Sequence, residues 1–187
     1  MKPNQQDNQL RIIAGRWRGR KLTFAPVPGL RPTPDRVRET LFNWLGPRLP
    51  GARCLDLFAG SGALGIEAAS RGAFDVVMVD NDPLVVRTLH EQLQSLDCSV
   101  AQVVQQDVNR WLAISATAFD IVFLDPPFRE NSLPECMHLL AANGWLATGA
   151  RVYLEAEKNY IPELPDGWQL SRSKCAGQVG YHLAVCA

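Results

Sequence analysis

Short apolar segments alternate with amphipathic helical patterns from Cys54 onward. The apolar segments are rich in Val, Leu, Ile and Phe and lack strict polar/apolar alternation, which is typical of strands buried on both faces of a parallel sheet. The predicted strands span residues 53–58, 74–80, 99–106, 119–125 and 151–156, and the predicted helices span residues 62–71, 83–96, 108–114 and 133–142. This order predicts β-α-β units and an α/β fold with a doubly wound, mostly parallel sheet.

The last part of the chain departs from this alternation. Residues 168–174 and 180–186 are predicted to form two strands joined through Gly177, with no room for a helix between them. We therefore expect an antiparallel hairpin to end the sheet.

The first fifty residues are predicted to form a separate unit. Two short strands, Leu10–Gly15 and Arg20–Phe24, enclose a turn rich in Gly and Arg, and a proline-rich connector leads to a helix with Thr33 as its N-cap. We divide the chain into a hairpin-and-helix extension at residues 1–47 and a main domain at residues 48–187.

Composition narrows the class of protein. The 187 residues are 47% hydrophobic and 20% charged, as in globular domains, and no apolar run reaches the length of a membrane span. The first twenty residues are too polar for a secretory signal. Five cysteines without a C-x-x-C pair favour neither a disulfide framework nor a zinc site. We therefore expect a cytoplasmic protein that binds no metal and no membrane. We further expect the protein to be a monomer.

The neutral total charge conceals two unlike halves. Residues 1–53 contain eleven Lys and Arg against three Asp and Glu, whereas the remainder contains 8 basic and 16 acidic residues. This asymmetry is typical of a basic arm that binds a polyanion, although a solvated basic surface without a partner would have the same composition.

A glycine-rich loop follows the first predicted strand of the main domain. Gly60, Gly62 and Gly65 match the G-x-G-x-x-G pattern of nucleotide-binding folds at a strand-to-helix junction. Asp80 ends the next strand, where its carboxylate can accept hydrogen bonds from ribose hydroxyls. These residues suit NAD and S-adenosylmethionine equally well.

Two further carboxylates favour S-adenosylmethionine. Asp56 precedes the glycines, where it can face the positively charged amino group of the methionine moiety. Asp107 follows the third strand and can accept a hydrogen bond from an adenine amino group.

The fourth strand ends in Asp125, Pro126, Pro127 and Phe128. Two consecutive prolines stiffen the turn and donate no N–H groups, so the turn offers acceptors: the Asp125 carboxylate and the Pro126 carbonyl. Two acceptors that hold the hydrogens of an exocyclic amino group can direct its lone pair at a sulfonium methyl group, while Phe128 stacks on the base. The pattern therefore predicts methylation of a purine amino group.

The segments DLFAGSG, VDNDP, QDV and DPPF, in this order, resemble those of class I S-adenosylmethionine-dependent methyltransferases that modify amino groups. Two N-terminal segments, RIIAGRWRGRKL and RPTPDRVRETLFNWL, are similar to those of the bacterial small-subunit (16S) ribosomal RNA guanine-N2 methyltransferases of the D type. The resemblance covers nearly the whole chain.

The resemblance implies a function and a set of site residues. It implies methyl transfer from S-adenosylmethionine to the N2 amino group of a guanine in 16S ribosomal RNA within the assembled small subunit. The implied cofactor contacts are Asp56, Phe58, Ala59, Gly60, Ser61, Gly62, Asp80, Asn81, Asp107 and Val108, and the implied catalytic residues are Asp125, Pro126, Pro127 and Phe128. The implied RNA contacts are Arg16, Trp17, Arg18, Arg20, Lys21, Arg31, Arg36 and Arg38.

Three alternatives remain at this stage. An adenine-N6 methyltransferase acting on RNA or DNA would use the same DPPF turn. An NAD-dependent dehydrogenase would explain the glycine loop but not that turn. A non-catalytic RNA-binding module would explain the basic arm but not the acidic residues near the loop.

Overall fold

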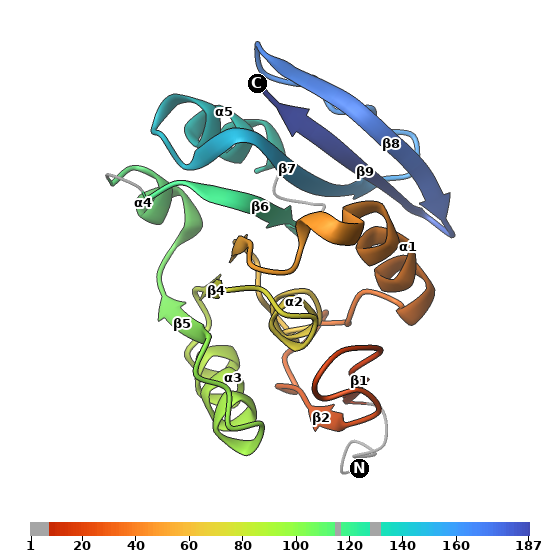
Figure 1. Cartoon of the computed structure of the whole chain (residues 1–187), viewed down its shortest axis with the longest axis vertical. Helices are drawn as coiled ribbons and strands as arrows, with labels where there is room; N and C mark the ends of the chain where they lie inside the picture. The colour runs from red at the N-terminus through yellow and green to blue at the C-terminus, as the bar shows by residue number, and fades with distance from the viewer. Residues whose placement is uncertain (1–7, 115–116, 128–131) are drawn as a thin grey trace.

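The computed structural model describes residues 8–114, 117–127 and 132–187. Seven strands form one sheet in the order β5-β4-β3-β6-β7-β9-β8 (Figure 1). Their bounds are β3 Arg53–Asp56, β4 Asp75–Asp80, β5 Ala101–Gln105, β6 Phe119–Leu124, β7 Leu146–Glu157, β8 Trp168–Ala176 and β9 Val179–Cys186. The first five of these pair in parallel, and β9 pairs antiparallel with both β7 and β8. The sequence-based prediction of a parallel sheet closed by an antiparallel hairpin is confirmed.

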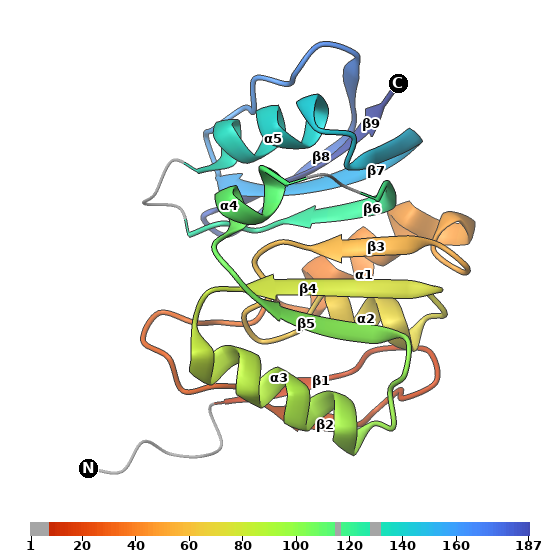
Figure 2. The same cartoon turned by 90° about the vertical axis from the view of Figure 1, so that its left-hand side faces the viewer.

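Helices cover both faces of this sheet (Figure 2). Their bounds are α1 Asp35–Leu45, the 3-10 turn η1 Gly46–Arg48, α2 Gly65–Ser70, α3 Pro83–Ser95, α4 Val108–Leu112 and α5 Leu133–Ala142. Apolar side chains of α1, α2 and α3 share one core cluster with alternate residues of the strands, and those of α4 and α5 share a second cluster on the other face. Among the described residues, no helix has both the length and the apolar character needed to cross a bilayer.

The N-terminal extension shares the core of the main sheet. A small hairpin of β1 (Gln9–Arg11) and β2 (Lys21–Thr23) precedes α1. Ile12, Leu22 and Leu41 belong to the same buried cluster as Cys54 of β3 and Met78 of β4. Burying these side chains together stabilises the extension against the sheet, since each removes apolar surface from water.

A buried carboxylate fixes the extension in place. The two carboxylate oxygens of Glu67, in α2, accept hydrogen bonds from the backbone N–H groups of Ile13 and Ala14, each at 2.9 Å. The same carboxylate forms ion pairs with Arg38 at 3.4 Å and with Arg71 at 2.7 Å. Because a buried charge requires such partners, Glu67 connects three separate segments at one point.

Several predicted bounds differ by a few residues, and the cap of α1 and the start of β7 differ in kind. The N-cap of α1 is Pro34, without a side-chain cap, so the prediction that Thr33 caps this helix is wrong; Thr33 is instead a buried residue of the connector before the helix. Strand β7 begins at Leu146, earlier than the predicted residue 151. The early start lies beyond a register shift in the β6–β7 pairing, where Phe119 pairs with Leu146 but Ile121 pairs with Arg151.

Candidate functional site

Four acidic side chains occupy neighbouring positions at the carboxyl ends of four adjacent strands. Met78, Asp56, Phe123 and Tyr153 lie in one cross-strand row of β4, β3, β6 and β7. Because strand residues two apart point to the same face, Asp80, Asp125 and Glu155 emerge on the face that carries Asp56. We call Asp56, Asp80, Asp125 and Glu155 the acidic row.

Burial and mutual repulsion make this row costly to ionise. Burial, followed by repulsion from Asp125 and Asp80, raises the pKa of Asp56 to about 7, although a hydrogen bond from Gly65 N–H opposes the rise. Burial likewise raises the pKa of Asp125 to about 6 and, together with the charge of Asp125, that of Glu155 to about 8. A cation bound beside this row would relieve the repulsion and favour the ionised forms.

The glycine loop lies directly beside the row. Gly60 and Gly62 have φ angles of +48° and +79°, which only glycine adopts readily. The Asp80 carboxylate accepts hydrogen bonds from Gly60 N–H and Asp82 N–H, both at 2.9 Å, and so ties the loop to the end of β4. A Cβ on Gly65 would lie 2.6 Å from the Met78 side chain and 3.2 Å from the Asp56 carboxylate. The third glycine is therefore required for close packing of α2 on the sheet.

The DPP turn extends from β6 into the same region. Asp125 is half-buried, Pro126 is buried and Pro127 is exposed. The structure therefore brings Asp125 and the prolines next to the glycine loop, as expected for a turn after the central strand of an open α/β sheet. Phe128 lies outside the described residues, so its expected stacking on a base stays a prediction.

The connector between β2 and α1 crosses this region. The side chain of Leu30 reaches the glycine loop, so that a Cβ on Gly60 would lie only 2.8 Å from its Cδ1. Further along the connector, the buried Thr33 lies close enough to Asp125 and Glu155 to lower the pKa of both carboxyl groups. The connector therefore lies beside both the glycine loop and the DPP turn.

The other predicted cofactor residues follow the ends of β3, β4 and β5. Ala59 and Ser61 are buried in the glycine loop, and Phe58 is half-buried against the second core cluster. Asn81 is exposed after β4. Asp107 caps α4 by accepting a hydrogen bond from Arg110 N–H at 3.0 Å, which places Val108 at the first position of that helix.

The basic turn, residues 16–21, lies at the amino-terminal ends of the strands, opposite to the acidic row. Arg16 N–H donates to the Ser70 carbonyl at 2.7 Å, and the Arg20 guanidinium donates to the Ser95 carbonyl at 2.9 Å. Both acceptors end helices that begin beside the acidic row, so the turn lies at the far ends of α2 and α3 (Figure 2). The structure therefore separates the predicted RNA contacts Arg16, Arg18, Arg20 and Lys21 from the DPP turn.

Two of the residues predicted to contact RNA are buried within the chain. Arg38 is 1% exposed, and its guanidinium contacts Glu67, Asp35 and the Thr33 and Arg11 carbonyls. Trp17 is 7% exposed and belongs to the core cluster. Both residues hold the extension in place, which leaves neither accessible for the RNA contact that we expected. Arg31 and Arg36 are exposed near the connector.

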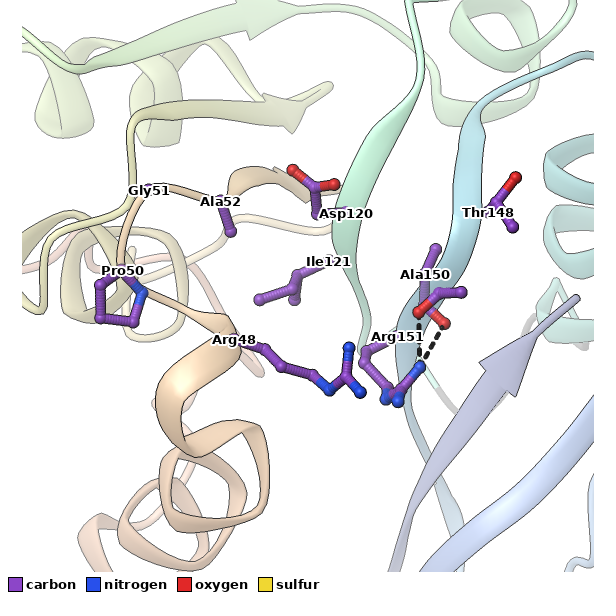
Figure 3. Close-up of a pocket in the computed structure, with 10 residues that line it drawn as sticks. Arg48, Pro50, Gly51, Ala52, Asp120, Ile121, Thr148, Ala150 and Arg151 are labelled. Atoms are coloured by element: carbon purple, nitrogen blue, oxygen red, sulfur yellow. Dashed lines mark hydrogen bonds between the residues drawn. The ribbon is translucent and has the colours of Figure 1, made fainter.

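Cavities lie at both ends of the strands. One of about 290 Å³ lies near the start of β6, where Arg48 and Arg151 point toward one another (Figure 3). The other, of about 190 Å³, is lined by Pro126 and Pro127, by the start of α5 and by the end of β7 with the loop after it, namely Ser132, Leu133, Glu155, Ala156, Glu157 and Tyr160. The smaller cavity is therefore the one that adjoins the DPP turn.

Comparison with known proteins identifies the family. A family model described as "Conserved hypothetical protein 95" matches residues 10–185. Ribosomal RNA small subunit methyltransferase D of Escherichia coli K12 is 51% identical over 184 residues, which cover 97% of this chain and 93% of that protein. The chain belongs to the small-subunit ribosomal RNA methyltransferase D family.

Solved structures share the fold of this chain. The structure of yhhF from Escherichia coli is 52% identical, has a TM-score of 0.87 and covers 95% of this chain and 98% of that chain. The fold is also shared with an RNA methyltransferase from Salinibacter ruber solved with S-adenosyl-L-homocysteine, at 18% identity and a TM-score of 0.63, covering 83% of this chain and 93% of that chain. The sequence-based assignment of fold and family is confirmed.

Sequence reasoning misses two members of the site. Glu155 lies within a predicted buried strand. A carboxylate in an apolar strand can itself indicate a site, because a buried carboxylate requires a hydrogen-bond or charge partner. The local pattern assigns Thr33 to a helix cap, a common role for threonine before a helix, and nothing near it in sequence indicates that it lies near Asp125 instead.

Proposed function

We propose that this protein transfers a methyl group from S-adenosylmethionine to the N2 amino group of a specific guanine in 16S ribosomal RNA, within the assembled small subunit. The proposal is supported chiefly by the position of the acceptor-rich DPP turn beside the glycine loop and the acidic row. Family membership supports ribosomal RNA as the substrate, because the curated relative in Escherichia coli carries that name.

The acidic row fits this methyl donor. S-adenosylmethionine supplies a methyl group on a positively charged sulfur, together with a positively charged amino group. Asp56 and Asp125 have raised pKa values because burial disfavours their ionised forms, and a cationic group would stabilise those forms. Asp56 would face the amino group, Asp80 the ribose hydroxyls and Asp107 the adenine amino group, while Gly60 and Gly62 let the backbone approach the donor.

The DPP turn would hold the acceptor nitrogen. The Asp125 carboxylate and the Pro126 carbonyl accept hydrogen bonds from the two N–H groups of the amino group. These bonds withdraw the nitrogen lone pair from the purine ring and direct the lone pair at the methyl group. As the new N–C bond forms, the C–S bond breaks and sulfur keeps the electron pair. The methylated nitrogen then loses a proton to Asp125 or to water. Orientation and electrostatic stabilisation supply most of the acceleration.

The separation of the basic turn from the DPP turn supports a large substrate. An RNA that contacts both Arg18 and Asp125 must extend along the strands, from their amino-terminal ends to their carboxyl-terminal ends. A purine in a folded particle can present itself in an exposed loop, where little unstacking is needed. We propose that the exposed Arg and Lys side chains of the basic turn contact such an RNA, together with Arg31 and Arg36.

The test uses labelled S-adenosylmethionine and small subunits isolated from cells that lack this enzyme. We expect label in 16S RNA, N2-methylguanosine in the nucleoside digest by mass spectrometry, and weak labelling of protein-free 16S transcript. N6-methyladenosine in the digest would establish the adenine alternative instead. Equal labelling of transcript and subunits would overturn the requirement for assembly.

Asp125→Ala tests the acceptor role. We expect a loss of methyl transfer of roughly a hundredfold or more with RNA affinity nearly unchanged, because the carboxylate acts on the reacting group. Asp166→Ala removes an exposed carboxylate from a loop and serves as the control. Wild-type activity in Asp125→Ala would exclude the proposed mechanism.

A further inference from the structure

The cavity at the amino-terminal ends of the strands has two arginine side chains that face each other. Arg48 is the last residue of η1, Arg151 belongs to β7, and the two side chains point toward one another in the cavity of about 290 Å³ (Figure 3). The DPP turn and the acidic row lie at the other ends of the strands. This cavity is therefore separate from the proposed methyl-transfer site.

Both guanidinium groups lack an acidic partner. In the part of the chain that the structure describes, neither Arg48 nor Arg151 forms an ion pair with a carboxylate. Burial, followed by the positive charge of Arg48, lowers the pKa of Arg151. Two like charges that face each other without a counter-ion repel, and an anion between them removes this cost.

An irregular stretch of β7 holds Arg151 in place. The β6–β7 pairing shifts register beside the cavity, so that Asp120 alone on β6 lies opposite residues 147–150 of β7. Gly149 in this bulge has a φ of +74°, which glycine adopts readily. The carbonyls of Gly149 and Ala150 accept hydrogen bonds from Arg151 Nη1. A bulge of this kind redirects a side chain, here the guanidinium that lines the cavity.

The charge and the size of the cavity favour a small anion. Asp120 also lines it, and its Oδ2 accepts the backbone N–H of Arg53 at 2.8 Å. Its one negative charge leaves the two facing arginines in excess, and a positive cavity attracts anions. Pockets for small molecules usually measure about 300–1,000 Å³, so this cavity suits a single oxyanion with its water better than a large ligand.

The cavity and the basic turn adjoin the same end of α2. Gly51, which lines the cavity, donates its N–H to the Gly72 carbonyl at 2.8 Å. Arg16, in the basic turn, donates its N–H to the carbonyl of Ser70, the last residue of α2, at 2.7 Å. Phosphate groups of one RNA strand can therefore reach both the basic turn and the cavity.

We propose that this cavity binds a phosphate group, with Arg48 and Arg151 donating N–H groups to different oxygens of the same phosphate. A guanidinium presents a planar fork of donors that matches phosphate oxygens, and two such groups on opposite sides can hold one tetrahedral anion. The position beside the basic turn favours an RNA phosphodiester over free phosphate as the source. This choice of source rests on the proposed function, whereas the phosphate chemistry does not.

Inorganic phosphate tests the site without RNA or S-adenosylmethionine. We expect phosphate, compared with chloride at equal ionic strength, to shift the Nε–H NMR signals of both Arg48 and Arg151. Arg48→Gln and Arg151→Gln should each raise the Kd for phosphate about tenfold, as for the loss of hydrogen bonds to a charged group. Arg172→Gln removes the same charge from the exposed strand β8 and should leave the Kd unchanged.

Thermal unfolding separates a binding site from a structural role. Arg48→Gln removes one of two charges that repel, so its Tm without phosphate should equal or exceed that of the wild type. The variant should also lose the rise in Tm that phosphate gives the wild type. A lower Tm with an unchanged rise would contradict the proposal.

Asp120→Asn tests the sign of the ligand's charge. Asparagine can still accept the Arg53 N–H but no longer repels an anion, so this variant should bind phosphate more tightly than the wild type. Weaker binding of phosphate by Asp120→Asn would contradict an anion site.

Isolated small subunits identify the source of the phosphate. Binding is measured over a range of salt concentrations, without methyl transfer. The double variant Arg48→Gln/Arg151→Gln should bind subunits more weakly and reduce the salt dependence of log K by about one, the value for one phosphate contact. Arg172→Gln should match the wild type.

The two assays together decide between the outcomes. Weaker subunit binding in the double variant supports an RNA phosphodiester, and an effect on inorganic phosphate alone supports a free phosphate-type anion. No effect of the arginine substitutions in either assay would overturn the proposal. The expected phosphate response in a protein that methylates no RNA would leave the site in place and overturn only the proposed function.

Discussion

The Arg38 guanidinium lies 3.4 Å from the Glu67 carboxylate, and the two side chains are 1% and 0% exposed. Arg38 belongs to α1 and Glu67 to α2, and Glu67 also accepts the N–H groups of Ile13 and Ala14. This ion pair therefore connects the N-terminal extension to the sheet that carries the proposed site.

Glu67→Gln should destabilise the whole protein. The substitution removes the negative charge that faces the buried Arg38 guanidinium, and breaking such a pair costs about 3–5 kcal/mol. Urea unfolding followed by circular dichroism measures the loss. Glu91→Gln is the control, because the Arg87–Glu91 pair is exposed with a 3.9 Å separation and should contribute less than about 1 kcal/mol. Equal effects of the two substitutions would contradict the anchoring role.

Asp56→Asn should weaken binding of S-adenosylmethionine without destabilising the fold. The pKa of Asp56 rises from 3.8 to about 7 on folding, so its ionisation disfavours the folded state as pH rises through this range. Asparagine removes that cost and can still accept a hydrogen bond from Gly65 N–H. At pH 8 we expect an unfolding free energy at least equal to that of the wild type, with a clearly higher Kd by calorimetry.

The same residue gives a pH dependence of binding. A cationic ligand favours ionised Asp56, so wild-type affinity should increase as pH rises through about 7 and then level off. Asp56→Asn should lack this increase, whereas Asp97→Asn, at an exposed position, should retain it. Identical pH profiles in wild type and Asp56→Asn would show that Asp56 does not face the ligand.

Gly62→Ala should damage the site more than an alanine at another left-handed glycine. Its Cβ would lie 2.6 Å from Ile66 Cδ1 and 2.8 Å from Leu89 Cδ2, in addition to the strain of a φ of +79°. Gly72→Ala carries similar strain at a φ of +94° but meets nothing within 4 Å. Each should lose about 1–2 kcal/mol from strain, and Gly62→Ala should lose more and also bind cofactor poorly. Thermal unfolding and calorimetry compare the two variants.

Arg18→Glu tests the basic turn as an RNA contact. Arg18 is exposed, so charge reversal should leave the fold unchanged while weakening binding to small subunits. Removing one phosphate contact reduces the salt dependence of log K by about one. Arg172→Glu, on the edge strand β8, makes the same charge change away from the proposed RNA path. Comparable losses in both variants would indicate a general charge effect.

The strands, most helices and the position of the site follow from local patterns. Helix α5 has the predicted bounds, and Asp56, Asp80 and Asp125 lie together because parallel strands end at one edge. The misassigned residues have partners distant in sequence. Arg38 resembles an exposed basic residue because its partner Glu67 lies on another helix, and no local pattern reports such a contact.

The neighbouring positions of Asp125 and Glu155 also have a consequence for synthesis of the chain. Asp56 and the glycine loop belong to the first third or so of the 187 residues, whereas Glu155 comes much later. A nascent polypeptide that already contains the glycine loop still lacks β7, and therefore lacks the strand beside Asp125. The acidic row is thus complete only after β7 has been made.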